Sequence, residues 1–532
     1  MKLNPKEIFA EYEKGVQHKA SLGKHGLFEQ NKINERFFIG DQWYGAKCGN
    51  DRPLVRYNII KRIGDYKMSQ ILSSPIAVDF SAEGIPQNKA EEHLPFEKLP
   101  TGKLNQSEIN ALTSAFGKYF EITAERLKLD ILQEKLLRNA YITGTGVLYT
   151  YWDQNAKTGL FADDKKTSEI KGDICCEVLD IDDIYFGDDC IEDIQSQPFI
   201  IIASTLPLSD ALKEARINGA DIGQLRDIEN GATDSKVLVL TKLFKEYKDD
   251  KSYTIKGIKV CENAVIRKAF DTGLRLYPIS LFKWERKNNS PIGESEITYL
   301  IPNQIAINRM ITANVWSAMT TGMPIMLVNG DTITQKITNE PGQIIKVYGS
   351  NEDVSGAVKY VEPPVFNAEY DASIKALIEN TLTQSGANEV ALGDSRADNY
   401  SALRTMRDAS LMPLSLTKKR FYAFVEDTAR IWADFWVTMY EKRKIKLSDE
   451  NGTWYMPFDA ARYRDLIFTT KVEVSEGALY GDSEKLDTLI SLFEKGVINR
   501  RQLISRLPNG VVANKKELLN EVIEEGDSLD GE

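Results

Sequence analysis

The sequence predicts an α+β fold, in which helical and β-rich regions occupy different parts of the chain. Apolar residues recur at three- and four-residue steps, as in helices, over 4–40, 56–72, 105–141 and most of 294–443. Short runs rich in β-branched and aromatic residues, as in strands, gather between 145 and 268. Glycines and prolines separate the two kinds of segment.

The composition is that of a globular protein with an acidic balance. The 532 residues predict three or four folding units, and the chain is 42% hydrophobic and 27% charged. A net charge of −11, from 67 basic and 78 acidic residues, argues against a protein whose main task is to grip nucleic acid. We expect no secretory signal and no membrane span, because the chain has no opening apolar run and no long apolar stretch. Five cysteines, an odd number at low density, indicate reduced thiols.

The N-terminal 40 residues are charged and helix-prone. Ile8, Tyr12 and Val16 form an apolar stripe along the expected helix. The sequence GDQWYG at 40–45 predicts a turn with its tryptophan packed beneath it.

Helices and strands are expected to alternate in the next hundred residues. We predict an amphipathic helix over 56–72, a strand over 76–80, a mobile loop or insertion over 84–102 and a helical region over 105–141. The two glycines of the following TGTG, at 143–146, could cradle phosphate. The order helix, glycines, strand is the reverse of a dinucleotide site, so a tight helix-to-strand turn is favoured.

Six short segments between 175 and 268 predict strands of a mixed sheet, with one helix at 208–217 among them. The strands are expected at 175–178, 183–186, 199–203, 236–245, 251–260 and 264–268. The acidic stretch 180–189 lacks the spacing of a calcium loop, so a solvated loop before a buried Tyr185–Phe186 pair is favoured over a metal site. The chain has no CxxC and its histidines are isolated, so a zinc site is not expected.

The stretch 291–392 predicts two long helices around a small β-rich insert. The first helix is expected over 294–320, with Pro302 starting a turn or a kink, and the second over 368–389. Three short β runs are expected between the helices, at 325–328, 343–347 and 358–361.

A third long helix is expected after the polar, turn-rich segment 393–400. Ser401 can cap this helix, which is predicted to continue to Arg443 and to break only at Pro413. At 1.5 Å per residue it would be about 60 Å long if straight. Helices of such length usually bury their apolar stripes against neighbouring copies.

The C-terminal region predicts a hairpin, one more strand and three short helices. The hairpin is expected from 444–447 and 454–457 around Asn451-Gly452, and the strand at 468–474. The helices are expected at 483–495, 499–507 and 515–525. This succession imitates a helix-turn-helix, but the acidic tail that follows would repel phosphate.

The sequence carries no recognisable catalytic motif. It has no G-x-x-x-x-G-K-[ST], H-E-x-x-H or G-x-S-x-G, so an ATP motor is not encoded and nothing positively indicates an enzyme.

The order of elements resembles the portal proteins of tailed bacteriophages and related viruses. Local matches are PIGESEI at 291–297 with NQIAINR at 303–309, YNII followed by SSPI at 57–76, GDQWYG at 40–45 and LFEKGVINR at 492–500. No single motif is diagnostic, and the succession over nearly the whole chain carries the resemblance. It implies a mixed α/β wing, a two-helix stem, a small β-rich clip, a long kinked helix and a helical C-terminal crown.

The resemblance divides the chain into an N-terminal wing followed by six further parts. These are the wing (1–290), first stem helix (291–321), clip (322–366), second stem helix (367–392), tunnel loop (393–400), long helix with its return to the wing (401–474) and crown (475–532). It implies no cofactor, no metal and no enzymatic activity.

Two groups of site residues follow from this division. The DNA-channel candidates are Asp394, Ser395, Arg396, Ala397, Asp398, Asn399, Tyr400, Arg404 and Arg407. The candidates for clip docking of the packaging motor are Lys336, Asn339, Glu340, Asn351, Glu352 and Asp353.

The resemblance implies a ring, usually of twelve copies, at one capsid vertex. Double-stranded DNA would pass through it without sequence selectivity during packaging and ejection. The expected partners are the terminase large subunit, head-completion or adaptor proteins, and the major capsid and scaffold proteins. The expected location is the virion, with assembly in the host cytoplasm.

Two other function classes stay open at the level of sequence. A helix-turn-helix DNA-binding regulator would need a basic recognition face and sequence-selective binding. A hydrolase would need a pocket containing carboxylates with shifted pKa values.

Overall fold

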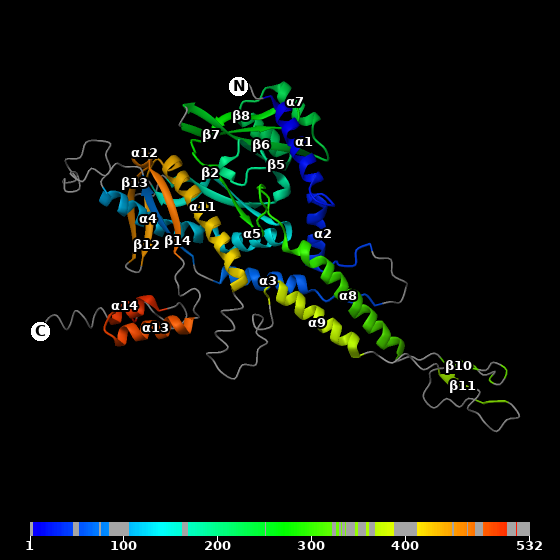
Figure 1. The fold of residues 1–532 in the computed structure, drawn as a ribbon. Coiled ribbons are helices and arrows are strands. Elements are labelled where there is room, and N and C mark those ends of the chain that lie inside the picture. Colours follow the sequence, from blue (N-terminus) through cyan, green and yellow to red (C-terminus); the bar gives the residue numbers. More distant parts are fainter. Residues whose placement is uncertain are drawn as a thin grey trace.

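The computed structural model describes most of the chain. The described residues are 4–45, 53–73, 76–83, 106–161, 169–249, 252–321, 326–328, 331, 333, 336, 346–348, 358–360, 368–387, 412–449, 452–464, 466–473, 482–507 and 518. A broad body of helices and sheets holds most of these residues, and a pair of helices, α8 and α9, extends away from it (Figure 1). The predicted loop 84–102 lies outside the described residues.

The helices account for about half of the described fold. They are α1 (Pro5–Ser21), α2 (Leu27–Ile39), α3 (Ile59–Leu72), α4 (Gln106–Leu127), α5 (Leu129–Thr143), α6 (Leu208–Ile217), α7 (Ile222–Asn230), α8 (Glu296–Thr321), α9 (Ala368–Gln384), α11 (Ser415–Met439), α12 (Ala460–Tyr463), α13 (Asp482–Glu494) and α14 (Arg500–Arg506). Short 3₁₀ turns lie at η2 (Ile181–Asp183), η3 (Ile194–Ser196) and η5 (Met412–Leu414).

The strands form small antiparallel sheets. They are β1 (Ala77–Glu83), β2 (Thr145–Phe161), β3 (Glu169–Leu179), β4 (Ile184–Phe186), β5 (Phe199–Pro207), β6 (Lys236–Asp249), β7 (Ser252–Val260), β8 (Val265–Asp271), β9 (Ile279–Lys283), β10 (Met326–Val328), β11 (Val358–Tyr360), β12 (Lys442–Asp449), β13 (Gly452–Asp459) and β14 (Ile467–Glu473). The orders are β3-β2-β9, β4-β5-β6-β7-β8, and the pairs β1-β14, β10-β11 and β12-β13. The α+β class is therefore confirmed.

The prediction of one mixed sheet between 175 and 268 is wrong. All the described strand pairs are antiparallel, and the segments divide between a three-stranded and a five-stranded sheet. The prediction missed β9, which pairs with the start of β2, for instance Thr145 with Lys283. It also missed α7, which Asp221 starts through a capping box with Gln224.

The body is organised around α11, whose residues from Phe421 to Val437 are mostly buried. Trp436 packs edge-on against Phe116 and Tyr119 of α4, with ring centroids 5.0 Å apart in both pairs. On its other side α11 packs against β14 and β9. Aromatic rings from distant parts of the chain thus fill one continuous core.

The third long helix ends earlier than predicted. Residues 401–411 lie outside the described residues, so the predicted break at Pro413 stays a prediction; Pro413 lies in η5, which directly precedes α11. The helix ends at Met439 rather than at Arg443, because Glu441 adopts a left-handed φ of 51° and the chain enters β12. The predicted hairpin 444–457 is confirmed, with Ile445 opposite Met456.

The α8–α9 hairpin is the pair of antiparallel helices that leaves the body (Figure 1). α8 continues through Pro302 as one helix. α9 ends at Gln384, five residues before its predicted end at 389, because Gly386 takes a φ of +76°. At the far end, β10 pairs with β11, Met326 opposite Tyr360. A strand was also expected at 343–347, but the described part of it, 346–347, is not a strand.

Candidate functional site

The candidate site residues from the sequence lie mostly outside the described residues. This holds for the whole predicted channel set, from Asp394 to Arg407. In the docking set it holds for Asn339, Glu340, Asn351, Glu352 and Asp353. Lys336 is described and its side chain is exposed, as a docking residue requires. The roles of these residues stay predictions.

The described residues on either side of the predicted channel segment lie next to each other. α9 ends just before Gly386, and η5 and α11 begin at Met412. A Cβ on Gly386 would lie 2.9 Å from Cβ of Pro413, so the two ends of the segment 388–411 are in contact. Any larger side chain at Gly386 would push these ends apart, and the positive φ disfavours it as well.

The hairpin α8–α9 is held at its base by apolar packing and one hydrogen bond. Ile307 of α8 and Ile374 and Leu382 of α9 are buried. Asn303 donates from Nδ2 to Oγ1 of Thr381 over 3.3 Å. The hydrogen bond fixes the height of one helix against the other.

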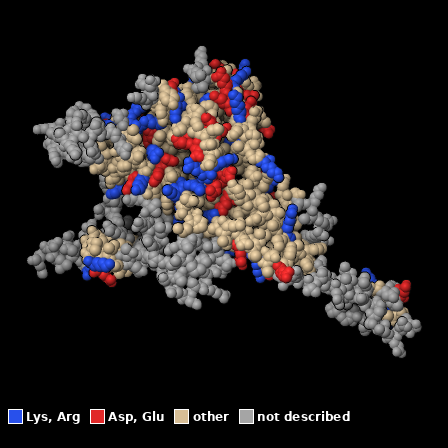
Figure 2. All heavy atoms as spheres, viewed as in Figure 1, with Lys and Arg blue, Asp and Glu red and all other residues tan. Residues whose placement is uncertain are grey.

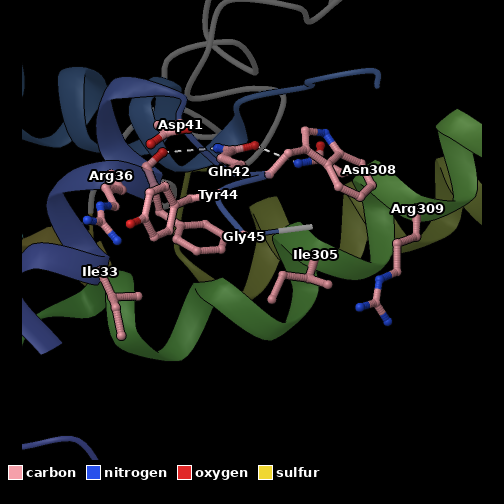
Figure 3. Close-up of a pocket in the computed structure, with 11 residues that line it drawn as sticks. Ile33, Arg36, Asp41, Gln42, Tyr44, Gly45, Ile305, Asn308 and Arg309 are labelled. Atoms are coloured by element: carbon pink, nitrogen blue, oxygen red, sulfur yellow. Dashed lines mark hydrogen bonds between the residues drawn. The ribbon is translucent and has the colours of Figure 1, made fainter. Parts of the chain in front are cut away.

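A surface cavity of about 360 Å³ lies where the hairpin meets the body. α2 and the turn 41–45 form one wall, and α8 forms the other (Figure 3). Its lining is mainly apolar and aromatic, from Ile33, Phe37, Trp43, Tyr44 and Ile305, with Arg36, Asp41, Gln42, Gly45, Asn308 and Arg309 as the remainder.

A buried amide network joins the turn to α8. Asn308 donates to Oε1 of Gln42 over 2.6 Å, and Gln304 donates to Oδ1 of Asn308 over 3.0 Å and to the carbonyl of Tyr57 over 2.7 Å. In return, Oε1 of Gln304 accepts the N–H of Ile59 at the start of α3. These contacts explain why the turn GDQWYG contains a glutamine and a tryptophan. Gln42 also donates to the carbonyl of Phe37 in α2, and the indole N–H of Trp43 donates to the carbonyl of Val55.

Two arginines belong to this cavity. The guanidinium of Arg36 lies 3.6 Å from the ring centroid of Tyr44, a cation–π contact. Arg309 is exposed, and its side chain extends from α8 away from the turn (Figure 3). The sequence motif NQIAINR lies in this part of α8. Which way each of its side chains points could not be inferred from the sequence, because the elements that pack against α8 were not known.

Apolar side chains are exposed around the same cavity. Ile39 and Tyr44 are 60% and 68% exposed, and Leu54 and Tyr57 are also exposed. Apolar groups gathered at one place on a surface are typical of contacts with another macromolecule.

The site offers apolar packing and cationic contacts. Its lining contains one carboxylate, Asp41, and has no histidine, cysteine or lysine. Across the described ranges no group of three or more metal-binding side chains occurs. Likewise, none of the helices that the structure describes combines the length and apolarity that crossing a bilayer requires.

A second cavity, of about 320 Å³, lies beside α11 and contains a buried carboxylate. Asp434 accepts the backbone N–H of Arg275 over 2.8 Å and that of Leu276 over 3.1 Å, and its other oxygen faces Nε of Arg275. Burial raises the pKa of Asp434, while these donors oppose the shift. Since all its partners hold the loop before β9, the carboxylate has a structural role.

The acidic stretch 180–189 covers a buried lysine that the sequence analysis missed. Lys19 of α1 is 3% exposed and donates to the carbonyls of Ile181, over 2.5 Å, and Asp182. Its ammonium also lies 4.0 Å from the ring centroid of Tyr185. Burial lowers the pKa of Lys19 to about 7, while the nearby aspartates oppose this shift. The predicted burial of Tyr185 and Phe186 is confirmed.

Comparisons with known proteins give many solved structures of low similarity, two of which are described here. No protein-family model matches the sequence, and no curated protein matches it. A chain in the neck of an empty gene transfer agent particle, computed with C6 symmetry, is 11% identical, with a TM-score of 0.35 over 87% of this chain and 90% of that chain. A chain in the virion of a native gene transfer agent particle is 11% identical, with a TM-score of 0.38 over 96% of this chain and 98% of that chain. TM-scores below 0.5 carry no functional argument, and the following proposal therefore rests on this chain's own residues.

Proposed function

We propose that this protein is a virion structural protein of the portal type, without enzymatic activity. Twelve copies of it would form a ring at one vertex of a capsid. The observation that carries this proposal is the α8–α9 hairpin, which extends from the body and bears a small β pair beyond its tip (Figure 1). In the portal arrangement these are the stem helices and the clip, and α11 is the long helix that returns into the wing.

The burial of α8 supports the ring. In its outer half, residues such as Met310, Val315 and Trp316 are only partly buried, and Met319 is 49% exposed. α9 packs along α8, and α2, α3 and α5 contact α8 as well. A helix with apolar residues on more than one side is stable in water when a second surface covers it, and a ring supplies that surface from the next copy.

The charge distribution supports a conduit rather than a DNA-gripping protein. On the face shown in Figure 2, lysines and arginines are interspersed with aspartates and glutamates. With a net charge of −11, the ring would repel double-stranded DNA overall, while single basic residues guide it without reading sequence.

The helix-turn-helix alternative has less support. α13 and α14 follow each other as predicted, and Asn499 starts α14 through a capping box with Gln502. The third helix, expected at 515–525, lies outside the described residues except for residue 518. The acidic sequence at the C-terminus is unfavourable next to phosphate, so we assign this region to the crown.

The test of the ring is direct. Negative-stain microscopy and mass photometry of the purified protein should show rings with a central hole and masses at multiples of the 60.0 kDa chain. Only monomers, at micromolar protein and over a range of salt concentrations, would overturn the proposal.

Within the ring, we assign the segment 393–400 to a loop facing the DNA. The contact between Gly386 and Pro413 supports this assignment, since a segment whose two ends touch can project from the fold as a loop. Arg396 is the preferred phosphate contact because its guanidinium is always charged and can fork onto phosphate oxygens, and Arg404 and Arg407 come next. Asp394 and Asp398 would limit the grip and keep the DNA mobile.

A charge reversal tests Arg396. R396A and R396E should form normal rings, and R396E should shorten the packaged DNA or reduce its retention. If R396E leaves packaged length and retention at wild-type values, Arg396 pairs with an aspartate of a neighbouring copy and does not touch DNA.

We assign the terminase large subunit, and later the head-completion or adaptor proteins, to the clip around β10 and β11. Exposed Lys336 supports a docking surface there. Deleting residues 350–355 should leave rings intact and weaken terminase binding. Unchanged binding and packaging would reject the docking role. The major capsid and scaffold proteins would contact the ring elsewhere.

A further inference from the structure

The two outer edges of the α8–α9 hairpin differ in charge. On the α8 edge, exposed Arg309 lies beside the cavity that also contains Arg36. On the α9 edge, Glu379 is exposed. Within the part of the chain that the structure describes, neither Arg309 nor Glu379 has an ion-pair partner. Each edge thus presents an unpaired charge of opposite sign.

Helix geometry places Arg309 on the side of α8 that faces away from α9. Successive residues of a helix are about 100° apart around its axis. Asn303 contacts α9, and Arg309, six residues later, is about 240° further round on the same scale. Ile305 and Asn308, which line the cavity, lie on this same side, about 200° and 140° from Asn303.

The same geometry places Glu379 on the side of α9 that faces away from α8. Ile374 is 5% exposed and marks the side packed on α8. Glu379, five residues later, lies about 140° round the helix from Ile374. Ala372, Ala376 and Thr383 share this exposed side, and they are small enough for another helix to come close.

The two charges lie at similar heights along the hairpin. The hydrogen bond between Asn303 and Thr381 gives the register. Arg309 is six residues from it toward the tip and Glu379 is two residues from it toward the tip, a difference of four residues or about 6 Å. Long arginine and glutamate side chains can span such an offset.

From these observations we propose that the α9 edge of one copy docks on the α8 edge of a second copy, with Glu379 of one facing Arg309 of the other. The proposal rests on the ring proposed above and names the surfaces that close it. The two edges are different surfaces on opposite sides of one hairpin, so their contact is head-to-tail. Head-to-tail contacts generate a ring when the rotation between copies closes and a filament when it does not, whereas a contact between two identical surfaces stops at a dimer.

The apolar surface around the cavity adds to the same edge. Tyr44, which lines the cavity with α8, and Ile39, the last residue of α2, are exposed, and the cation–π contact with Arg36 holds Tyr44 in place. The incoming copy would cover them, so that apolar burial supplies affinity while the charge pair sets the register and excludes the reversed contact.

A charge-swap experiment tests the pairing. R309E, E379R and the double variant R309E/E379R are compared with the wild type by mass photometry across a protein dilution series. Each single reversal should raise the protein concentration at half-assembly about tenfold, since it turns an attraction into a repulsion at every interface. The double variant should recover most of this loss, because it restores the pair with its signs exchanged.

Matched controls come from α7, at the other end of the body. Arg226 and Glu229 are exposed there, and R226E and E229R make the same changes in net charge. They should assemble as the wild type does. Circular dichroism melting of all variants separates loss of assembly from loss of fold.

The outcomes separate this inference from the proposed function. A wild type that never assembles rejects both. Wild-type rings together with normal assembly of both single reversals overturn only the pairing. Impaired single reversals without recovery in the double variant also overturn it, because the two residues then do not face each other.

Discussion

The body around α11 and the α8–α9 hairpin bury their apolar residues in opposite ways. In the body, Trp432 and Trp436 are fully buried among rings contributed by the same chain. In the outer part of the hairpin, Val315 is half-buried and Met319 is exposed. The body therefore carries the stability of a single copy, and the hairpin exposes apolar surface that the proposed ring would cover.

The largest expected effect is in the body. W436A would remove a ring packed against Phe116, Tyr119 and Phe80 and leave a cavity. It should cost about 3–5 kcal/mol of stability. The expected observation is insoluble protein or a melting temperature lower by many degrees. Y247A, at a tyrosine that is 64% exposed, is the control and should melt as the wild type does. If W436A and the wild type had equal melting temperatures, α11 would not be the centre of the core.

The second effect concerns the buried carboxylate. D434A would remove the acceptor of the backbone N–H groups of Arg275 and Leu276 and of Nε of Arg275, whose guanidinium would keep only its hydrogen bond to the carbonyl of Leu466. We expect a loss of about 2–4 kcal/mol and faster proteolysis near 272–276. D427A, on the same helix with a side chain 54% exposed, should change stability little. A D434A protein as stable as D427A would show that the loop before β9 keeps its conformation without the Asp434 carboxylate.

The third effect depends on pH. The pKa of Lys19 falls from 10.5 in the unfolded chain to about 7 in the folded protein, so the unfolded chain binds the extra proton between these values. The stability contributed by Lys19 should therefore rise as pH increases from about 7 toward 10. The melting temperature of the wild type relative to K19M should increase from pH 7 to pH 9. K14M, at an exposed lysine of the same helix, controls for the loss of one positive charge, and a flat K19M difference would contradict the burial of Lys19.

The smallest expected effect on a single copy is in the hairpin. M319K changes an exposed residue and should alter monomer stability by no more than about 0.5 kcal/mol. Melting at a concentration too low for assembly would check this. The same variant should weaken assembly, because a charge would enter the surface that the next copy covers. A large fall in monomer melting temperature would mean that the hairpin is part of the single-copy core.

Local sequence signals predicted the elements better than their ends and partners. Periodicity located most of the helices, and Asn451-Gly452 located the β12–β13 hairpin. The end of α9 depends on Gly386 meeting Pro413, and the end of α11 on the left-handed conformation of Glu441. β9 is a short apolar run after Pro278 whose partner, β2, lies more than a hundred residues away. No local pattern contains these long-range contacts.

The candidate site, too, could be predicted from the sequence only in part. The turn 40–45 was found because its composition is distinctive, and packing of Trp43 was expected. Arg36, Arg309 and Glu379 were missed, since exposed charges on helices are common and only the three-dimensional neighbours give them meaning. Lys19 was missed because its acidic partners lie some 160 residues away.

The contrast between the self-contained body and the hairpin is tested most directly by hydrogen–deuterium exchange and mass spectrometry on monomers and on rings. The amides of α11 should exchange slowly in both states, because its core is formed within one chain. The amides in the outer part of α8 and in α9 should exchange quickly in monomers and at least tenfold more slowly in rings, where a neighbouring copy covers them. Equal protection of the hairpin in both states would contradict the account.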